Sequence, residues 1–553
     1  MSETTPVVVE GESEVGGLSH SLSPKARAIA WIPAAVALLF FVAFSAIVLS
    51  QPEKMIEPDP YAYRASIAAL ENGNLTLTQD QYDALSTSLQ QSSLGGGIMQ
   101  WHQNADGTWV SEKNPGYPFL AIGFDEAGAL RLAPLFYGAL ACLAMWFGAR
   151  RWLGRWGGTF AVGAYCSTAL AMVMAWRSTM PTFTDASLVA VGLGLLIWSV
   201  VALDRTVRHR TIVGALAFFA FGLAVFVRYT NVAVLAVAAV FALAVCLRPK
   251  WRLGWKTLLW WAAASLPPLI ASLAYNSAVF DGPFSTGYNA STVQFSLSAI
   301  PDNLRLMPSR LWQSMPIFVI GLIAIVVLIV LQSVQAVRAR SKNHAEASAE
   351  SVLTANEPEV EVEVAPIVGV EPGTIDRWIG IFLVLAWAAT WATYSAYEWT
   401  ANFGGGRNTG SLSLGGPAGG GMPGIGGMGG MTQPVYSTVR FYLPALGAIA
   451  LLVAWLFTRL PAIVGVIALI ALFAFGAHEF IDTVNSSWAS MRMNGDRGAM
   501  VGPGAGDGPM GTPNADPRNG PGGGGPPGNG QGGTRPIPPN GSPSAPPQGG
   551  PTG

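Results

Sequence analysis

Charged side chains are scarce in this chain. Only 11% of its 553 residues are Asp, Glu, Lys or Arg, whereas 51% are hydrophobic, and the mean hydropathy is +0.39. A soluble fold with so few charges would have to hide many apolar runs of about twenty residues, the length that crosses a ~30 Å hydrocarbon core. The composition therefore excludes a soluble protein and predicts an all-α polytopic membrane protein.

Cysteine is rare, and neither sign of charge is in excess. The three cysteines, Cys142, Cys166 and Cys246, lie inside apolar runs, without the spacing of a disulfide framework or a metal site. The formal net charge of −1 excludes a nucleic-acid partner recognised through bulk basic charge. The first partner to expect is the lipid bilayer, and other partners have to be inferred from local groups of charge.

The apolar runs predict about eleven transmembrane helices. Lys25 and Arg27 precede the first run and place the N-terminus in the cytoplasm of a plasma-membrane protein. Basic clusters then recur on every second connection, and an odd number of spans puts the C-terminus outside. The expected spans are residues 29–50, 128–149, 157–176, 186–203, 211–227, 230–247, 257–275, 313–336, 377–396, 440–458 and 461–480.

The segments between the spans differ in composition. Those rich in Gly and Pro are expected to be disordered, because they cannot bury enough apolar surface to offset chain entropy. The predicted regions are a disordered cytoplasmic tail (1–28), a membrane domain (29–480) with a large first extracytoplasmic loop (51–127), a cytoplasmic linker (337–375) and a Gly-rich outer loop (404–431), and a low-complexity extracytoplasmic tail (481–553).

The densest polar cluster follows the first span directly. It contains Glu57, Asp59, Tyr61 and Arg64, at the place where a hydrophobic span meets water. Carboxylates at such a site can act as bases, while an arginine and tyrosines can bind a polar substrate. We therefore take Asp59 as the candidate catalytic base and the other three residues as candidate substrate ligands.

The same cluster predicts a short helix on the membrane surface. Pro60 suits the first helical position, and Asn72-Gly73 supplies the stop. Asp59 then falls at the N-cap, a role worth ~1 kcal/mol that does not exclude catalysis. Arg64 is expected to point away from the apolar face, which lies along the membrane interface and consists of Tyr63, Ile67 and Leu70.

Further polar residues mark the outer ends of later spans. Thr184 or Asp185 suits the N-cap of the fourth span. Arg177, Arg228 and Arg440 lie near outer span ends, against the positive-inside preference. Snorkelling to headgroups explains each arginine alone, whereas several converging on one face favour a bound phosphate or pyrophosphate group.

Two outer segments carry aromatic residues. Tyr117, in the turn-rich segment 114–119 before the second span, is an interface aromatic or lines a substrate groove. Tyr288 ends a polar and aromatic segment, 280–288, whose composition could bind a sugar. In that segment Gly287 suits a close backbone approach.

In their order, these motifs resemble the GT-C superfamily of polytopic glycosyltransferases, which includes family 39 and protein-O-mannosyltransferase relatives. The resemblance covers roughly residues 29–458. Here Glu-Pro-Asp replaces the usual adjacent Asp and Glu, and no well-defined soluble C-terminal domain follows. The motifs are Glu57 and Asp59 in the first loop, Asn114-Pro-Gly-Tyr-Pro118, Thr184-Asp185, Arg228-Tyr-Thr-Asn231, Phe280–Tyr288 and Arg440-Phe-Tyr-Leu-Pro444.

The resemblance implies transfer of a sugar from a polyprenyl-phosphate donor to an envelope glycan, lipid or protein on the outer membrane face. It also implies that the first-loop acid, Asp59, is the base toward the acceptor. The candidate substrate-binding residues are Glu57, Tyr61, Arg64, Tyr117, Arg177, Asp185, Arg228, Tyr288 and Arg440.

Such an enzyme needs one base and some cations, because a lipid phosphate is already a good leaving group. Asp59, with its pKa raised by partial desolvation, would accept the proton, and the outer arginines would offset charge on the phosphate. Direct displacement predicts inversion at the anomeric carbon. Glu57 and Asp59 could also share Mg²⁺ or Mn²⁺, although two carboxylates do not define a metal site. The alternatives are a transporter or flippase and a noncatalytic envelope scaffold.

Overall fold

The computed structural model describes residues 24–53, 58–91, 100–248, 251, 253–280, 282–288, 295–353, 372–398, 400 and 435–499. Residues 1–23 of the predicted N-terminal tail, the Gly-rich outer loop and most of the C-terminal tail lie outside these residues, so their predicted disorder stays a prediction. Residues 24–28 of that tail belong to helix α1, so the predicted boundary of the tail was wrong.

The described residues contain ten helices that are long and apolar enough to cross a membrane, or eleven spans if one bent pair counts as a span. All of them fall on the eleven predicted segments, and the chain is therefore an all-α, multi-pass membrane protein. The helices are α1 (Pro24–Ser50), α5 (Ala133–Leu153), the bent pair α6 (Gly157–Cys166) and α7 (Ala169–Trp176), α8 (Thr182–Val201), α9 (Val207–Val227), α10 (Val232–Cys246), α11 (Trp255–Val279), α13 (Ile317–Leu353), α14 (Pro372–Ser395), α17 (Leu446–Phe457) preceded by the 3₁₀ helix η6 (Arg440–Ala445), and α18 (Ala462–Ala499).

The predicted single span 157–176 is a pair of helices, α6 and α7, that meet at 63°. The break lies at Ser167 and Thr168. Thr168 has extended backbone angles, and its side-chain oxygen accepts a hydrogen bond from the Ala171 amide at 3.2 Å. It therefore starts a new helix as an N-cap, a local signal that a continuous apolar run conceals.

The centre of the bundle is formed by α8 and α17. In the most apolar stretch of each helix, 78% of α8 and 89% of α17 is buried, against 28% of α1, α11, α13 and α18. These last four helices therefore face outward.

Helix α5 packs closely on α8, backbone against backbone. A Cβ atom at Gly148 would lie only 2.3 Å from the Gly194 carbonyl oxygen. The C-terminal end of α8 is fixed by Arg210, whose buried guanidinium donates to the carbonyls of Ser199, Val200 and Trp251 at 2.7–3.0 Å.

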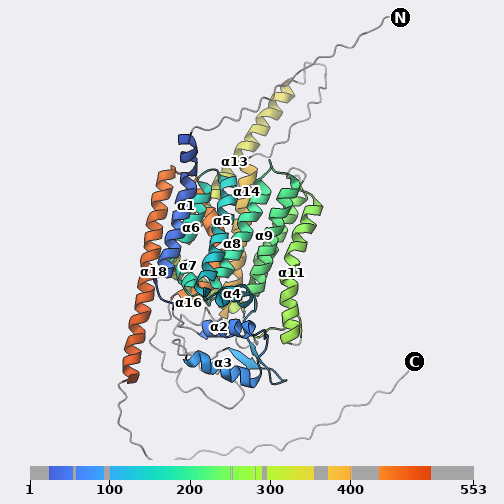
Figure 1. Ribbon diagram of the computed structural model, residues 1–553. Coiled ribbons are helices and arrows are strands. Elements are labelled where there is room, and N and C mark those ends of the chain that lie inside the picture. Colours follow the sequence, from blue (N-terminus) through green and yellow to red (C-terminus); the bar gives the residue numbers. More distant parts are fainter. Residues whose placement is uncertain are drawn as a thin grey trace, which may run out of the picture. The chain divides into compact units, whose positions relative to one another are not determined.

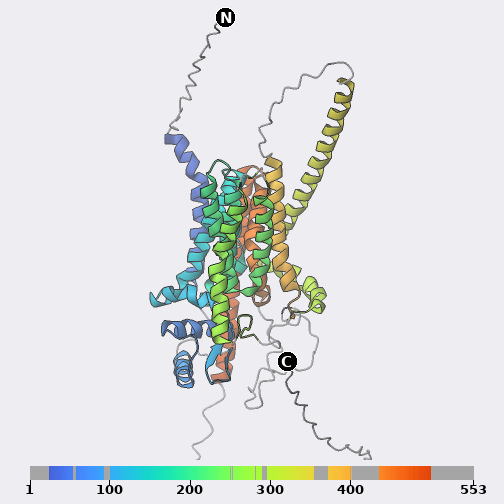
Figure 2. The same cartoon turned by 90° about the vertical axis from the view of Figure 1, so that its right-hand side faces the viewer.

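The first loop forms a small layer at one end of the bundle. It contains α2 (Pro58–Glu71), α3 (Gln79–Gln91), an antiparallel hairpin of β1 (Trp101–Gln103) and β2 (Trp109–Ser111), and α4 (Gly116–Glu126). Helices α2 and α3 lie beyond the spans at one end, and the second half of α13 extends from the other (Figure 1). The turned view shows α12 (Ile300–Ser314), drawn in yellow-green, at the end that carries α2 (Figure 2).

Two helices run far beyond their predicted ends, by more than ten residues each. Helix α13 continues through Leu353, so the first part of the predicted linker is helical. Helix α18 continues to Ala499, past the predicted end at residue 480. Apolar composition marks only the lipid-crossing part of a helix, and polar turns that continue it carry no such signal. Which end of the bundle faces the cytoplasm stays a prediction.

Candidate functional site

Neither of the two predicted acidic N-caps is a cap. Helix α2 begins at Pro58, so Asp59 lies inside its first turn. Helix α8 begins at Thr182 with Pro181 at the N-cap position, so Asp185 also lies inside the helix. A proline before each acid starts its helix a few residues earlier than expected, because its fixed φ suits the first turn. Both carboxylates are thereby free to bind other groups.

The predicted end of α2 is confirmed, but the predicted environment of its apolar face is wrong. Gly73 has φ +72° and its amide donates to the Leu70 carbonyl at 2.8 Å, as expected of a helix stop. Tyr63 and Ile67 are buried in the main core rather than lying along the membrane interface. Tyr63 meets the ring of Tyr117 on α4 edge to face, with centroids 6.0 Å apart, so α2 is seated on the bundle.

Asp59 is ion-paired with two cations from distant parts of the chain. Its Oδ1 lies 3.0 Å from Lys113 Nζ, and its Oδ2 lies 2.6 Å from Arg440 Nη2. The side chains of Lys113 and Arg440 are only 9% and 8% exposed, and that of Asp59 is 15% exposed. Burial of this degree protects the pairs from water and salt.

The position of Lys113 depends on the hairpin and on the loop after α11. Lys113 follows β2, and its amide donates to Ser111 Oγ at 3.1 Å. Its ammonium lies 5.3 Å from the ring centroid of Tyr288. A Cβ at Gly287 would lie 2.5 Å from the Cα of Glu112, which confirms the predicted close backbone approach and brings the two loops together.

The charges around Asp59 reverse the predicted direction of its pKa. Burial alone would raise the pKa, but Lys113 and Arg440 outweigh burial and hold it well below its usual value. The prediction of a raised pKa was therefore wrong, because it included the desolvation but not the two cations. Burial acts to lower the pKa of Lys113, but the nearby Asp59 carboxylate outweighs burial. The pKa of Lys113 is therefore raised above its usual value. In this state Asp59 is a persistent anion and a weak base.

A second buried ion pair joins α8 to the end of α9. Asp185 is fully buried, and its Oδ2 lies 3.4 Å from Arg228 Nε. Asn231 donates a hydrogen bond to the other carboxylate oxygen, and Arg228 Nη2 donates to Thr182 Oγ1 at 3.2 Å. The remaining guanidinium nitrogen, Nη1, is buried and makes no hydrogen bond of good geometry within the described residues, although the Tyr394 hydroxyl lies close to the guanidinium group.

Aromatic side chains connect the two ion pairs. The guanidinium groups of Arg228 and Arg440 lie 5.5 and 5.0 Å from the ring centroid of Phe441. Tyr394 and Tyr397 pack on the same ring, with centroid separations of 5.3 and 5.2 Å. The three cations and two carboxylates thus form one cluster with an aromatic wall, and the cluster carries one net positive charge.

Tyr63 lies close enough to both ion pairs to feel the charges of Asp59, Arg228 and Arg440. Burial raises the pKa of its hydroxyl well above the usual value. The electrostatic effects of Tyr288 and Asp59 add to the rise, whereas Arg228 and Arg440 oppose it. The hydroxyl is therefore neutral at physiological pH and can donate a hydrogen bond to an anion.

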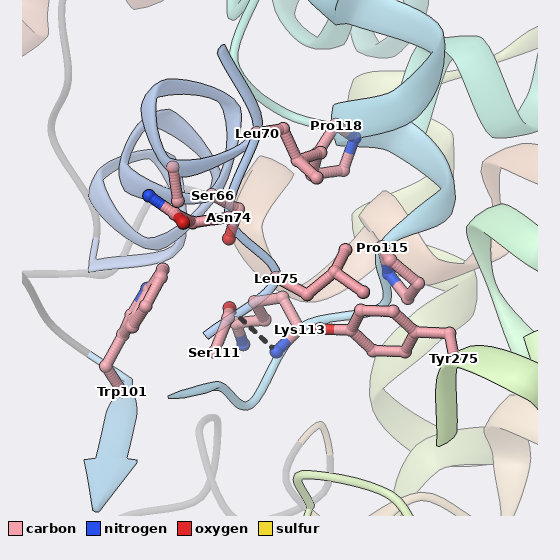
Figure 3. Close-up of a pocket in the computed structure, with 11 residues that line it drawn as sticks. Ser66, Leu70, Asn74, Leu75, Trp101, Ser111, Lys113, Pro115, Pro118 and Tyr275 are labelled. Atoms are coloured by element: carbon pink, nitrogen blue, oxygen red, sulfur yellow. Dashed lines mark hydrogen bonds between the residues drawn. The ribbon is translucent and has the colours of Figure 1, made fainter. Parts of the chain in front are cut away.

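The close-up shows a small hollow beside Lys113, between α2, the hairpin, the start of α4 and α11 (Figure 3). Its volume is about 20 Å³, which is room for about one water molecule. A sugar phosphate does not fit there. The lining residues include Ser66, Leu70, Ser111, Lys113, Pro118 and Tyr275.

Two other predicted substrate ligands, Arg64 and Tyr117, bind groups outside the cluster. Arg64 is ion-paired with Asp125 of α4. Tyr117 is fully buried and donates to the Ser178 carbonyl, so it is a core residue rather than an interface aromatic. Tyr61 and Arg177 are buried on α2 and at the end of α7. Glu57 lies outside the described residues.

Lys113 was not predicted as a site residue. A lysine in a polar loop is usually solvated, so its type alone gave no signal, although it directly precedes the Asn114-Pro motif. Glu53 was not predicted either; it is partly buried just after the end of α1 and accepts a hydrogen bond from Ser178 Oγ at 2.6 Å. Burial raises the pKa of Glu53.

The Arg64–Asp125 pair predicts a pH effect on stability, because Glu71 lies beside it. Although Glu71 is exposed, partial desolvation is the largest cause that raises its pKa to about 7, and a hydrogen bond with Asp125 adds to it. The folded protein therefore binds this proton more tightly than the unfolded chain does. The resulting stabilisation is complete below the unfolded pKa of 4.5 and is lost as the pH rises through about 7.

We therefore expect Glu71→Gln to raise the thermal unfolding midpoint at about pH 8 and to leave it unchanged at about pH 4. Differential scanning fluorimetry in detergent at both pH values measures this. Asp80→Asn, on the exposed side of α3, is the matched control and should shift neither midpoint. A lower midpoint for Glu71→Gln at the higher pH would contradict the assignment.

Comparisons with protein families, with curated proteins and with solved structures found no match to this chain. The GT-C resemblance therefore depends on the sequence motifs alone. Within the described residues, no group of three or more His, Cys, Asp or Glu side chains is placed to hold a metal ion. The Mg²⁺ or Mn²⁺ site suggested for Glu57 and Asp59 includes a residue outside that range and stays a prediction.

Proposed function

We propose that this protein is a membrane glycosyltransferase that transfers a sugar from a polyprenyl-phosphate donor to a cell-envelope acceptor. The reaction takes place at the membrane face that carries α2, which we assign to the outside. The observation that carries the proposal is the convergence of Lys113 and Arg440 on Asp59, with the Arg228–Asp185 pair adjoining through Phe441.

The cations suit the leaving group of this reaction. A polyprenyl-phosphate sugar is a phosphodiester with one negative charge, and cleavage leaves a phosphate monoester with up to two. Lys113, Arg228 and Arg440 can stabilise the added charge in a site from which most water is excluded. Arg228 is suited to this role because its Nη1 has a hydrogen-bond donor to spare within the described structure.

Asp59 is the base in this mechanism. The acceptor hydroxyl oxygen forms the new bond to the anomeric carbon while its proton passes to the Asp59 carboxylate. The bond between the anomeric carbon and the phosphate oxygen breaks, and its electron pair leaves with the polyprenyl phosphate. The single displacement inverts the anomeric configuration.

The resting ion pairs impose a condition on this step, because they make Asp59 a weak base. A donor phosphate that binds Lys113 and Arg440 shares their charge, so the pKa of Asp59 rises toward its usual value. Donor binding therefore activates the base, and the enzyme does not deprotonate a hydroxyl before the donor is in place.

The test is a transfer assay with the full chain in proteoliposomes that contain polyprenyl-phosphate hexoses or pentoses and an envelope-glycan acceptor. We expect donor cleavage, with appearance of free polyprenyl phosphate and an inverted product. A flippase would move the donor between leaflets without cleaving it. Donor that crosses the bilayer intact in every assay would refute the proposal.

A further inference from the structure

We propose that α12 is a membrane-surface helix that lies in the lipid headgroup layer at the α2 end of the bundle, with one edge inserted into the bilayer. This inference does not depend on the proposed function. It concerns a non-spanning helix with apolar side chains that are more than half exposed among the described residues.

The fifteen residues of α12 divide into three sides at about 100° per residue. One side packs on the bundle, a second is apolar and exposed, and a third is polar and exposed. Leu304 and Trp312 of the second side are each 56% exposed, and Leu297 just before the helix is 81% exposed. The buried side consists of Asn303, Met307, Leu311 and Ser314, and the polar side of Asp302, Arg305, Ser309 and Gln313.

The position of α12 in the chain identifies the bilayer as the partner of its apolar side. The helix ends at Ser314, and the span of α13 begins at Ile317, so α12 joins a transmembrane segment almost directly. Ile323 and Val326 of that span are 51% and 59% exposed and face lipid. A helix with Trp and Leu on one exposed edge and charges on another is typical of the headgroup boundary.

The same helix is bonded to two segments of the candidate site. The Asn303 side-chain amide donates to the carbonyls of Ser395 and Tyr397 at 2.8 and 2.9 Å. Arg310 donates to Thr438 Oγ1 at 3.0 Å, two residues before Arg440. The lipid contact of α12 therefore fixes the depth in the membrane of the segments that carry Tyr397 and Arg440.

Site-directed spin labelling of the full chain in lipid nanodiscs tests the placement. Labels are attached to single cysteines at Leu304, Trp312, Ser309 and Gln313. We expect the ratio of collision with oxygen to collision with a water-soluble nickel chelate to be severalfold higher at 304 and 312 than at 309 and 313. The native cysteines are buried, and the labelled parent chain measures their background.

Two positions calibrate the scale, Ile323 on the exposed face of α13 for lipid and Asp106 on the hairpin turn for water. Positions 304 and 312 should resemble Ile323, and positions 309 and 313 should resemble Asp106. Nickel access at 304 and 312 equal to that at Asp106 would place α12 in water. Low collision rates with both oxygen and the nickel chelate at 304 and 312 would show that protein covers these two positions. Either result would overturn the proposal.

Discussion

Replacing Asp59 by Asn should have opposite effects on turnover and on donor binding. We expect sugar transfer to fall by about 10²- to 10⁴-fold, the usual contribution of a general base. The affinity for polyprenyl phosphate should rise, because Lys113 and Arg440 would no longer be neutralised by a carboxylate. Transfer is measured in proteoliposomes, and affinity by fluorescence displacement or native mass spectrometry.

Asp125→Asn is the matched control for this variant. It also removes a carboxylate that pairs with a first-loop segment, since Asp125 binds Arg64 of α2, but this pair lies apart from the cluster. We expect the control to keep both transfer and affinity near the wild-type values. Retained donor binding by Asp59→Asn would itself show that the variant is folded. Unchanged transfer by that variant would exclude Asp59 as the base.

The buried pair of Asp185 and Arg228 should give the largest effect on stability. Removal of one partner of a buried ion pair leaves an uncompensated charge and typically costs about 3–5 kcal/mol. We therefore expect Arg228→Met to lower the thermal unfolding midpoint strongly, since Asp185 is fully buried. The double variant Arg228→Met with Asp185→Leu should recover most of this loss, because it buries no charge.

The double variant also separates stability from function. It removes the guanidinium nitrogen that makes no hydrogen bond of good geometry within the described residues, yet it should fold nearly as well as the wild type. We expect it to bind polyprenyl phosphate more weakly. If the double variant were as unstable as the single one, the pair would not be the source of the loss. Unchanged affinity would remove Arg228 from the phosphate site.

The spans were predictable from sequence because the bilayer imposes a length and a polarity on every helix that crosses it. All eleven apolar segments contain helices where expected. The break between α6 and α7 was not predictable in the same way, since it depends on a single capping threonine, Thr168. The extensions of α13 and α18 are polar, and polarity alone does not distinguish helix from coil.

The site was predictable in its parts but not in its pairings. Asp59 and Arg440 were both identified as unusual, yet they lie 381 residues apart in the chain, and only the tertiary fold brings them together. Arg228 was predicted as a phosphate ligand, but its pairing with Asp185 was not predicted. Lys113 was missed, and with it the direction of the Asp59 pKa, because a single loop lysine has no periodic or spacing signal.

The most direct test of the phosphate site is a structure of the full chain in nanodiscs with bound polyprenyl phosphate. We expect the phosphate at the α2 end of the bundle, within hydrogen-bond distance of Lys113, Arg228 and Arg440, with the Asp59 carboxylate released from at least one of its two ion pairs. Phosphate bound at another place, with both ion pairs of Asp59 intact, would contradict the proposed site and mechanism.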